Sequence, residues 1–203
     1  MAFNIVTKNT VRDRFVSPAR PEIWKDTPTS DWGNWIWQQQ KRIKTMDVLE
    51  KVIHVTEEER NAFKESHEMF NMGITPYYAS LMDPNDPNCP IRLQSVPKAG
   101  ELNILPDDLE DPLAEERDMP VPGITHRYPD RVLFYTTHNC PVYCRHCTRK
   151  RKVSDPSSAA ANKQLEDGLA YIEQHKEIRD VVISGGDPLS NSDDRLEYIL
   201  SRL

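Results

Sequence analysis

The sequence lacks the features of a membrane-bound or secreted protein. It has no run of about 18 apolar residues. Its first residues, MAFNIVTKNT, contain no apolar core of the length found in signal peptides. Cysteine is scarce as well, with four residues in a chain of 203. We therefore expect a cytoplasmic protein with no membrane partner, in which cysteines stay reduced and act as metal ligands or catalysts.

Positive charge and glycine are also in short supply. The 26 lysine and arginine residues are outnumbered by 32 aspartate and glutamate residues, which gives a net charge of −6. A chain with this balance is not shaped as a whole for nucleic acid, which we do not expect as a partner. Seven glycines stand against 16 prolines, most of them before residue 130, so long irregular connections are expected there.

The first part of the chain predicts helices. Residues 21–80 have helical patterning, and DWGNWIWQQQKRI carries four apolar side chains near helical spacing. These side chains are Trp32, Trp35, Ile36 and Ile43, and we expect the tryptophans to pack against a larger body. Thr56 and Glu59 have the spacing of a capping box at the start of a helix.

Loops follow the predicted helices. Residues 83–90, DPNDPNCP, are punctuated by proline and predict a loop. Residues 101–120 are acidic and rich in turn-forming residues. We interpret them as a connection across a surface, without a chemical role.

The pattern changes at residue 131 to alternating strands and helices. RVLFYTT (131–137) and DVVIS (180–184) predict two buried strands. A helix is expected within 157–174, with Leu165, Leu169 and Ile172 on one face. Another is expected from about Ser192, with an apolar stripe of Leu196, Ile199, Leu200 and Leu203. This β-α-β-α order predicts an α/β fold with a parallel sheet.

The length suggests that this α/β unit is incomplete. Parallel strands need cover on both faces, and a full α/β barrel takes about 250 residues. We therefore expect residues 1–125 to form a helical and loop-rich extension. Residues 126–203 would then form the start of a truncated (β/α) barrel, the front part of a longer protein.

Three cysteines follow the first predicted strand at C-x3-C-x2-C spacing: Cys140, Cys144 and Cys147. Ligands bind at this end of the strands in α/β folds. An iron–sulfur cube held by three thiolates keeps one iron open for a further ligand, as a catalytic zinc site keeps its fourth position open. Two alternatives are a structural zinc site completed by His138 or His146, and cysteines without a metal. Cys89, far off in a proline-rich loop, is better interpreted as a lone thiol.

These residues carry a resemblance to a known family. The C-x3-C-x2-C motif resembles the signature of the radical S-adenosylmethionine (SAM) superfamily. HRYPDRVLFYTTHNCPVYCRHCTRKR (126–151), RDVVISGGDPL (179–189) and DPNDPNCPIRLQSVP (83–97) resemble lysine 2,3-aminomutase and its relative glutamate 2,3-aminomutase. The likeness covers roughly residues 30–203. It implies the front part of a partial (β/α) radical SAM barrel preceded by a helical N-terminal extension.

The resemblance assigns two cofactors to the cysteine loop and the turn after the second strand. Cys140, Cys144 and Cys147 would bind three irons of a 4Fe–4S cluster, and SAM would bind the fourth. Tyr143 would lie near the adenine of SAM, or it fills the apolar side of the loop. Gly185, Gly186 and Asp187 would receive the amino group of SAM, since glycines allow close approach of backbone to a ligand. Their alternative is an ordinary turn from strand to helix.

Pyridoxal 5′-phosphate (PLP) is the second organic cofactor that the family implies. Arg127, Tyr128 and Arg131 match the positions that hold its phosphate, or they form an ordinary turn into the strand. Arg149 matches the arginine that binds the α-carboxylate of the substrate. The neighbouring cations form a solvated basic edge, or a weaker candidate for a nucleic-acid patch; they are Arg145, Lys150, Arg151 and Lys152.

The activity implied is an isomerase reaction, a radical 1,2-shift of the α-amino group of an amino acid to its β-carbon. L-lysine, giving L-β-lysine, is our first choice of substrate and glutamate the alternative. The lysine that anchors PLP would lie beyond residue 203. Flavodoxin or ferredoxin would donate the electron, and the full-length protein is expected to be a homo-oligomer. The competing function of another class is a zinc-stabilised binding module.

Overall fold

The computed structural model describes residues 18–66, 71–150, 152–153 and 162–203. Short helices dominate the first half of the chain, and strands alternate with longer helices in the second. In chain order the elements are η1 (Glu22–Trp24), α2 (Thr29–Trp32), α3 (Trp35–Gln40), α4 (Met46–Leu49), α5 (Glu57–Ser66), α6 (Pro76–Ser80), α7 (Pro90–Leu93), η2 (Ala99–Leu102), β1 (Ile124–Tyr128), β2 (Arg131–Thr137), α8 (Asn162–Gln174), β3 (Asp180–Gly185), η4 (Pro188–Ser190) and α9 (Asp193–Arg202).

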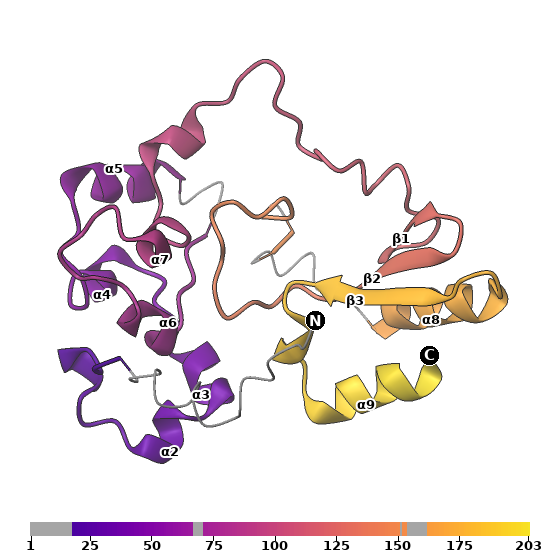
Figure 1. Cartoon of the computed structure of the whole chain (residues 1–203), viewed down its shortest axis with the longest axis horizontal. Coiled ribbons are helices and arrows are strands. Elements are labelled where there is room, and N and C mark those ends of the chain that lie inside the picture. The colour runs from indigo at the N-terminus through magenta and orange to yellow at the C-terminus, as the bar shows by residue number, and fades with distance from the viewer. Residues whose placement is uncertain (1–17, 67–70, 151, 154–161) are drawn as a thin grey trace, which may run out of the picture.

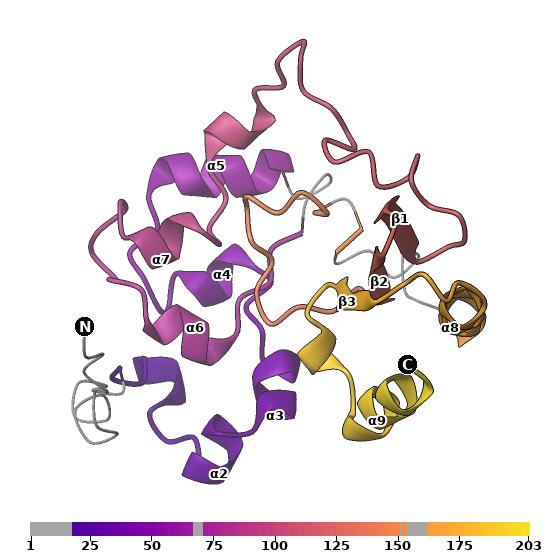
Figure 2. The same cartoon turned by 45° about the vertical axis from the view of Figure 1, so that its right-hand side comes forward.

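The loop that carries the three cysteines lies between the two halves. Figure 1 shows the helices of the N-terminal extension on one side and the small sheet with α8 and α9 on the other. The connection from η2 to β1 arches over the gap, and the cysteine loop, in orange, lies beneath that arch in both views (Figures 1 and 2). The loop can therefore be held from both halves of the chain.

The extension has its own apolar core. Its fully buried members include Ile43, Leu49 and Ile74, and the rings of Trp24 and Trp37 flank that of Trp32. The prediction that Trp35 packs against a body is wrong for this structure, because its side chain is 46% exposed, and the neighbouring Ile36 is 48% exposed. Helix α3 spans only six residues, so its period cannot bury every apolar side chain that falls near helical spacing.

A buried ion pair supports α5. The capping box is confirmed: the Glu59 carboxylate accepts from the Thr56 N–H at 2.9 Å, and Thr56 Oγ1 accepts from the Glu59 N–H at 3.2 Å. The same carboxylate is gripped by Arg92 of α7, whose Nε and Nη2 donate at 2.9 and 2.5 Å. Both side chains are completely buried. Burial alone would raise the pKa of Glu59, but the bonds from Arg92 and Thr56 outweigh it and hold the pKa below its usual value.

The second half confirms a mixed α/β unit built on a small open sheet. Strands β2 and β3 pair in parallel, with Phe134 opposite Ile183, and α8 connects them. The described part of α8 agrees with the predicted helix; the predicted residues 157–161 lie outside the described chain. Ile124, Phe134 and Leu169 belong to the core between sheet and helices. The division into units at residue 125 stays a prediction.

The parallel pairing predicted for the two strands is confirmed, and the sheet also contains β1, an unpredicted strand that pairs antiparallel to β2. ITHRY is short, and its burial falls from a buried Ile124 to an exposed Tyr128, so it lacks a clear strand pattern. The prediction that β3 is buried holds only in part, since Val182 is exposed. No described strand pairs with its other edge.

Helix α9 begins at Ser192, whose Oγ accepts from the Arg195 N–H. Of its predicted apolar stripe, Ile199 is buried, whereas Leu200 and Leu203 are exposed. Within the described ranges of the chain, no helix combines the length and apolar character needed to cross a membrane.

Replacing Glu59 should destabilise the extension strongly. Glu59→Gln leaves the buried Arg92 guanidinium without its counter-charge, so we expect a loss of about 3–5 kcal/mol in the free energy of unfolding, measured in urea. Glu50→Gln removes a partner of the exposed pair with Arg60 and should cost less than about 1 kcal/mol. Equal effects of the two substitutions would contradict the assignment.

The pair also predicts a pH dependence. The pKa of Glu59 is lowered by folding from 4.5, so the charged carboxylate contributes stability above that pH. That contribution should be lost as the pH falls through the lower folded-state value. Wild type should therefore lose stability more steeply than Glu59→Gln in acid titrations followed by circular dichroism.

Candidate metal centre

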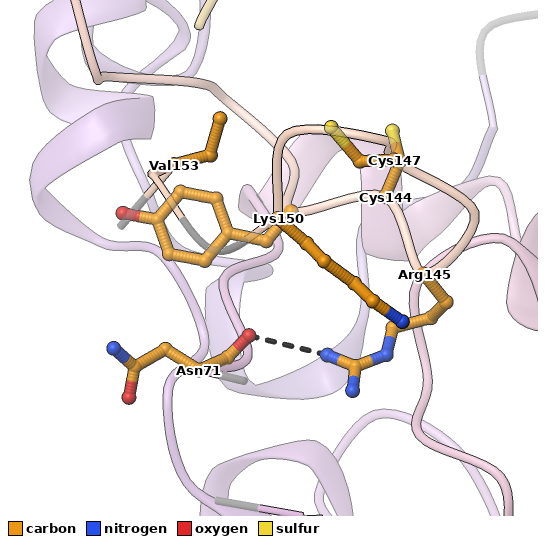
Figure 3. A pocket seen from close by; sticks show the side chains of 7 residues that line it. Asn71, Cys144, Arg145, Cys147, Lys150 and Val153 are labelled. Carbon is orange, nitrogen blue, oxygen red and sulfur yellow. Dashed lines mark hydrogen bonds between the residues drawn. The ribbon is translucent and has the colours of Figure 1, made fainter. Parts of the chain in front are cut away.

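The cysteine loop leaves the C-terminal end of β2. Cys140, Cys144 and Cys147 are all free and half-buried. The Cys147 N–H donates to the Cys144 carbonyl at 3.1 Å, which closes a tight turn between them. Figure 3 shows the thiol groups of these two residues on the same side of the loop. Three thiols are thus carried by one short segment.

The electrostatics of the loop favour a cationic ligand. Burial, together with the negative charges of Cys147 and Asp187, raises the pKa of the Cys140 thiol to about 12. Burial and the charge of Cys147 also raise the pKa of Cys144. A charged Cys147 thus disfavours the thiolate forms of Cys140 and Cys144, whereas bound iron stabilises a thiolate. The donor set therefore fits an iron–sulfur cluster chemically.

The geometry gives no support to a single zinc ion. Among the described residues, no group of three His, Cys, Asp or Glu side chains is close enough to hold one metal ion. Ligands of one zinc ion must all lie about 2.0–2.3 Å from it, so His138 or His146 would have to move together with the cysteines. Thiolates on a cluster bind different irons and need not converge on one point. Cys89 is a separate buried thiol, whose sulfur accepts from the Asp83 N–H.

The glycine turn after β3 lies against the start of this loop. The Gly186 N–H donates to the Thr137 carbonyl at 2.5 Å, and the Asp187 N–H to the Asn139 carbonyl at 2.7 Å. Gly185 has a φ of +128°, and a Cβ there would lie 2.3 Å from the Thr137 oxygen. A Cβ on Gly186 would lie 2.2 Å from the Asn139 oxygen. Glycine at both positions is what allows the turn and the loop to touch.

A cavity of about 530 Å³ opens beside this turn. Such a volume lies within the range of about 300–1,000 Å³ common to small-molecule sites. Pro141, Asp187 and Leu189 form one wall of it, and Trp35 and Tyr77 of the extension line the other. The sequence offered no signal for this second wall, because its residues are far away along the chain.

The hollow in Figure 3 is much smaller. Cys144, Cys147, Tyr143, Arg145 and Asn71 are among the residues that line it, and its volume is about 10 Å³. That is room for at most one water molecule.

Tyr143 points toward the extension. Its N–H donates to the Gly73 carbonyl at 2.8 Å, and a Cβ on Gly73 would lie only 2.8 Å from its ring. The guanidinium of Arg42 lies 5.1 Å from the ring centre and donates to the phenol oxygen at 3.0 Å. The ring therefore fills space between loop and extension, and its contact with adenine stays a prediction.

Arg149 is held in a partly buried bidentate pair. Its Nε and Nη2 donate to the Glu115 carboxylate at 2.9 and 2.6 Å, and its Nη1 donates to Ser184 Oγ at 3.1 Å. The hydrogen bond and charge of Glu115 raise the pKa of Arg149. Glu115 belongs to the acidic connection, so sequence reasoning missed it.

The basic run is not the solvated edge that we predicted. Arg145 is only 8% exposed, pairs with Glu101 at 2.7 Å and donates to the Asn71 carbonyl at 3.2 Å. Lys152 lies 3.5 Å from Glu116, and Lys150 lines the small hollow. Arg151 lies outside the described residues. The connection interpreted as chemically silent thus supplies the carboxylates that neutralise this run.

The candidate phosphate ligands lie elsewhere. Tyr128 and Arg131 flank the β1–β2 hairpin, at the opposite end of the seven-residue β2 from the cysteines and so about 20 Å away. Arg127 donates to Asp118 at 2.7 Å and Arg131 to Asp180 at 3.0 Å, while Tyr128 is exposed. The structure does not bring these residues together with the loop, and their role stays a prediction.

Adding a methyl group to the glycine turn should release the loop. Gly186→Ala places a Cβ against the backbone of Asn139, so we expect a loss of about 2–4 kcal/mol in unfolding free energy. Iron binding on anaerobic reconstitution should fall with it. Gly100→Ala is the matched control, since nothing lies within 4 Å of its added Cβ. If both variants unfold and bind iron alike, the contact does not brace the loop.

Comparison with known proteins agrees with this geometry. The family described as "4Fe-4S single cluster domain" matches residues 127–202. The chain is 51% identical over 182 residues to L-lysine 2,3-aminomutase of Bacillus subtilis (strain 168), which covers 90% of this chain and 39% of that relative. It is 48% identical over 184 residues to L-lysine 2,3-aminomutase of Clostridium subterminale, with 91% and 44% covered.

A relative with another name is similar over the same region. Glutamate 2,3-aminomutase of Clostridioides difficile is 43% identical over 173 residues, 85% of this chain and 41% of that relative. The chain spans less than half the length of these curated relatives. With three cysteines on the loop after β2 and a glycine turn packed against it, the chain belongs to the lysine 2,3-aminomutase family of radical SAM proteins.

Proposed function

We propose that this chain is the cluster-binding and SAM-binding front part of a 2,3-aminomutase that acts on an amino acid. The observation that carries this proposal is the packing of the three-cysteine loop against the Gly185-Gly186-Asp187 turn. A loop with three thiols and a ligand-accepting turn beside it suits a cluster that keeps one iron open. The reaction class follows from the family and its relatives' names.

The cysteines of the loop and the residues of the turn have different roles in this proposal. Cys140, Cys144 and Cys147 bind three irons as thiolates, and the lack of a fourth cysteine in the loop leaves the fourth iron for SAM. The backbone carbonyls and carboxylate of the turn accept hydrogen bonds from an ammonium group. When bound, the reduced cluster would supply one electron, and SAM would accept it and serve as the source of the radical that acts on the substrate. The surrounding protein orients the reactants and excludes water.

Arg149 binds the substrate carboxylate in this proposal. The Glu115 carboxylate accepts hydrogen bonds from Nε and Nη2 of Arg149 and thereby fixes the plane of the guanidinium. The Nη1 group, which Ser184 bonds only once, and the second N–H of Nη2 stay available as donors. A guanidinium held this way meets a carboxylate without first losing side-chain entropy.

PLP completes the proposed cofactor set. Arg127, Tyr128 and Arg131 are this chain's candidates for its phosphate. Asp118 and Asp180 already pair with the two arginines, so a phosphate would have to replace these carboxylates. The described residues of this chain therefore do not form a ready phosphate site for PLP by themselves.

L-lysine is the first choice of substrate, and glutamate the second. Relatives with either name are similar to the chain, and the greater identity is to proteins named for lysine. An electron donor of the flavodoxin or ferredoxin type and assembly into a homo-oligomer complete the proposal.

Anaerobic reconstitution with iron and sulfide tests the cluster. We expect a brown protein with about four irons per chain, whose EPR signal after dithionite reduction changes when SAM is added. SAM should be cleaved to methionine and 5′-deoxyadenosine. Alanine in place of Cys140, Cys144 or Cys147 should abolish these signals. Cys89→Ala is the matched control and should retain them, because its thiol lies outside the loop.

Two outcomes would count against the proposal. A colourless protein that binds one zinc ion per chain and unfolds with chelator would favour the binding module instead. If a cluster forms but its EPR signal does not change when SAM is added, electron transfer would be favoured as the function instead. The substrate is decided by incubating the complete enzyme with L-lysine and, separately, with L-glutamate, and by comparing how much β-amino acid forms from each.

A further inference from the structure

The N-terminal extension makes direct backbone contact with the cysteine loop. Ile74 forms antiparallel bridges with both Ile43 and Val142, so three separate segments lie side by side. The Tyr143 N–H donates to the Gly73 carbonyl, and the Arg145 N–H donates to the Gln94 carbonyl at 2.8 Å. The loop is therefore fixed from the extension as well as from the glycine turn.

Arg42 adds a side-chain contact at the centre of this interface. Its Nη1 donates to the carbonyl of Cys140 at 2.6 Å and to the phenol oxygen of Tyr143 at 3.0 Å. Its Nε donates to the carbonyl of Gln39, at the end of α3, at 3.1 Å. One guanidinium thus connects α3 with both ends of the segment between the first two cysteines.

The bond to Cys140 restrains a peptide group that can donate nothing itself. Pro141 follows Cys140, so the amide between them has no N–H, and its carbonyl is held by Arg42. Rotation of this peptide would move the Cys140 side chain relative to Cys144 and Cys147. A hydrogen bond from a charged donor is stronger than a neutral one. The bond from Arg42 is therefore well suited to prevent that rotation.

Arg42 differs from the other arginines around the loop. Arg145 and Arg149 are paired with Glu101 and Glu115. Within the part of the chain that the structure describes, Arg42 has no carboxylate within ion-pair distance, and its Nη1 donates to the loop. Its contacts are therefore those of a group that holds the loop in shape.

We propose that Arg42 is a positioning residue for the cluster, which sets the peptide of Cys140 and couples cluster binding to the folding of the extension. This inference rests on the proposed cluster. By linkage, a ligand that binds only the shaped loop stabilises the contacts that shape it. Loading the cluster should therefore protect the amides of Ile43 and Tyr143 from hydrogen exchange, through their bonds to Ile74 and Gly73.

The test measures how fast the reconstituted chain loses iron to a chelator under anaerobic conditions. Arg42→Gln removes the charged bond to Cys140, so iron loss should be about tenfold faster than in wild type. Arg42→Lys keeps the charge with one donor group and should lie between the two. Cluster-induced protection of the Ile43 and Tyr143 amides should shrink in the same order.

Two variants separate positioning from general effects. Lys41→Gln removes the same charge from an exposed neighbour, and its iron loss should stay within about twofold of wild type. Ile53→Val loosens the buried core of the extension away from the loop. At matched unfolding midpoints, Ile53→Val should lose iron more slowly than Arg42→Gln.

The inference is overturned if Arg42→Gln loses iron no faster than Lys41→Gln, or no faster than Ile53→Val at equal stability. If the wild-type chain itself takes up no 4Fe–4S cluster, the proposed function fails and this inference fails with it. If the wild-type chain binds the cluster and Arg42→Gln loses iron at the same rate, only the role of Arg42 is overturned.

Discussion

The shape of the cysteine loop depends on hydrogen bonds from outside it. Of the described residues after Thr137 and before α8, none belongs to a regular helix or strand, so no internal ladder holds the three thiols in place. The glycine turn bonds the start of the loop at Thr137 and Asn139, and the extension bonds it at Tyr143 and beyond. Cys140 and Cys144 lie between these attachments, and Cys147 follows the last of them, at Arg145, by two residues. Their relative positions therefore follow from both halves of the chain, which no single element could provide.

The acidic connection gives this loop a second kind of support. Its carboxylates Glu101 and Glu115 meet Arg145 and Arg149, which would otherwise place two charges in a partly buried region. Desolvating an unpaired guanidinium is costly, so the pairs decide where these side chains lie. The connection has little regular structure, yet it fixes the arginine that our proposal gives to the substrate.

Elements with strong local signals could be predicted from the sequence, whereas contacts between distant residues could not. Strands β2 and β3, helix α9 and the Thr56–Glu59 capping box have patterns confined to a few residues, and each was expected. Strand β1 was missed because five residues of mixed polarity have no clear period. For the site, the cysteines and the glycine turn were named from their motifs. Arg42 and Glu115 were not, since a charge pattern does not reveal which distant group it meets.

The spacing of the loop places the proposed cluster ligands and the proposed carboxylate-binding arginine on one segment. Arg149 lies two residues beyond Cys147, and the Val153 N–H returns to the Arg149 carbonyl at 2.9 Å. A displacement of the loop would therefore move the proposed carboxylate-binding group together with the thiolates. A reaction needs its reacting atoms held about 3–3.5 Å apart and correctly oriented. In the function that we propose, bracing one short segment from two sides would provide that alignment, and the extension, which carries none of the proposed cluster ligands, would contribute through its contacts with the loop.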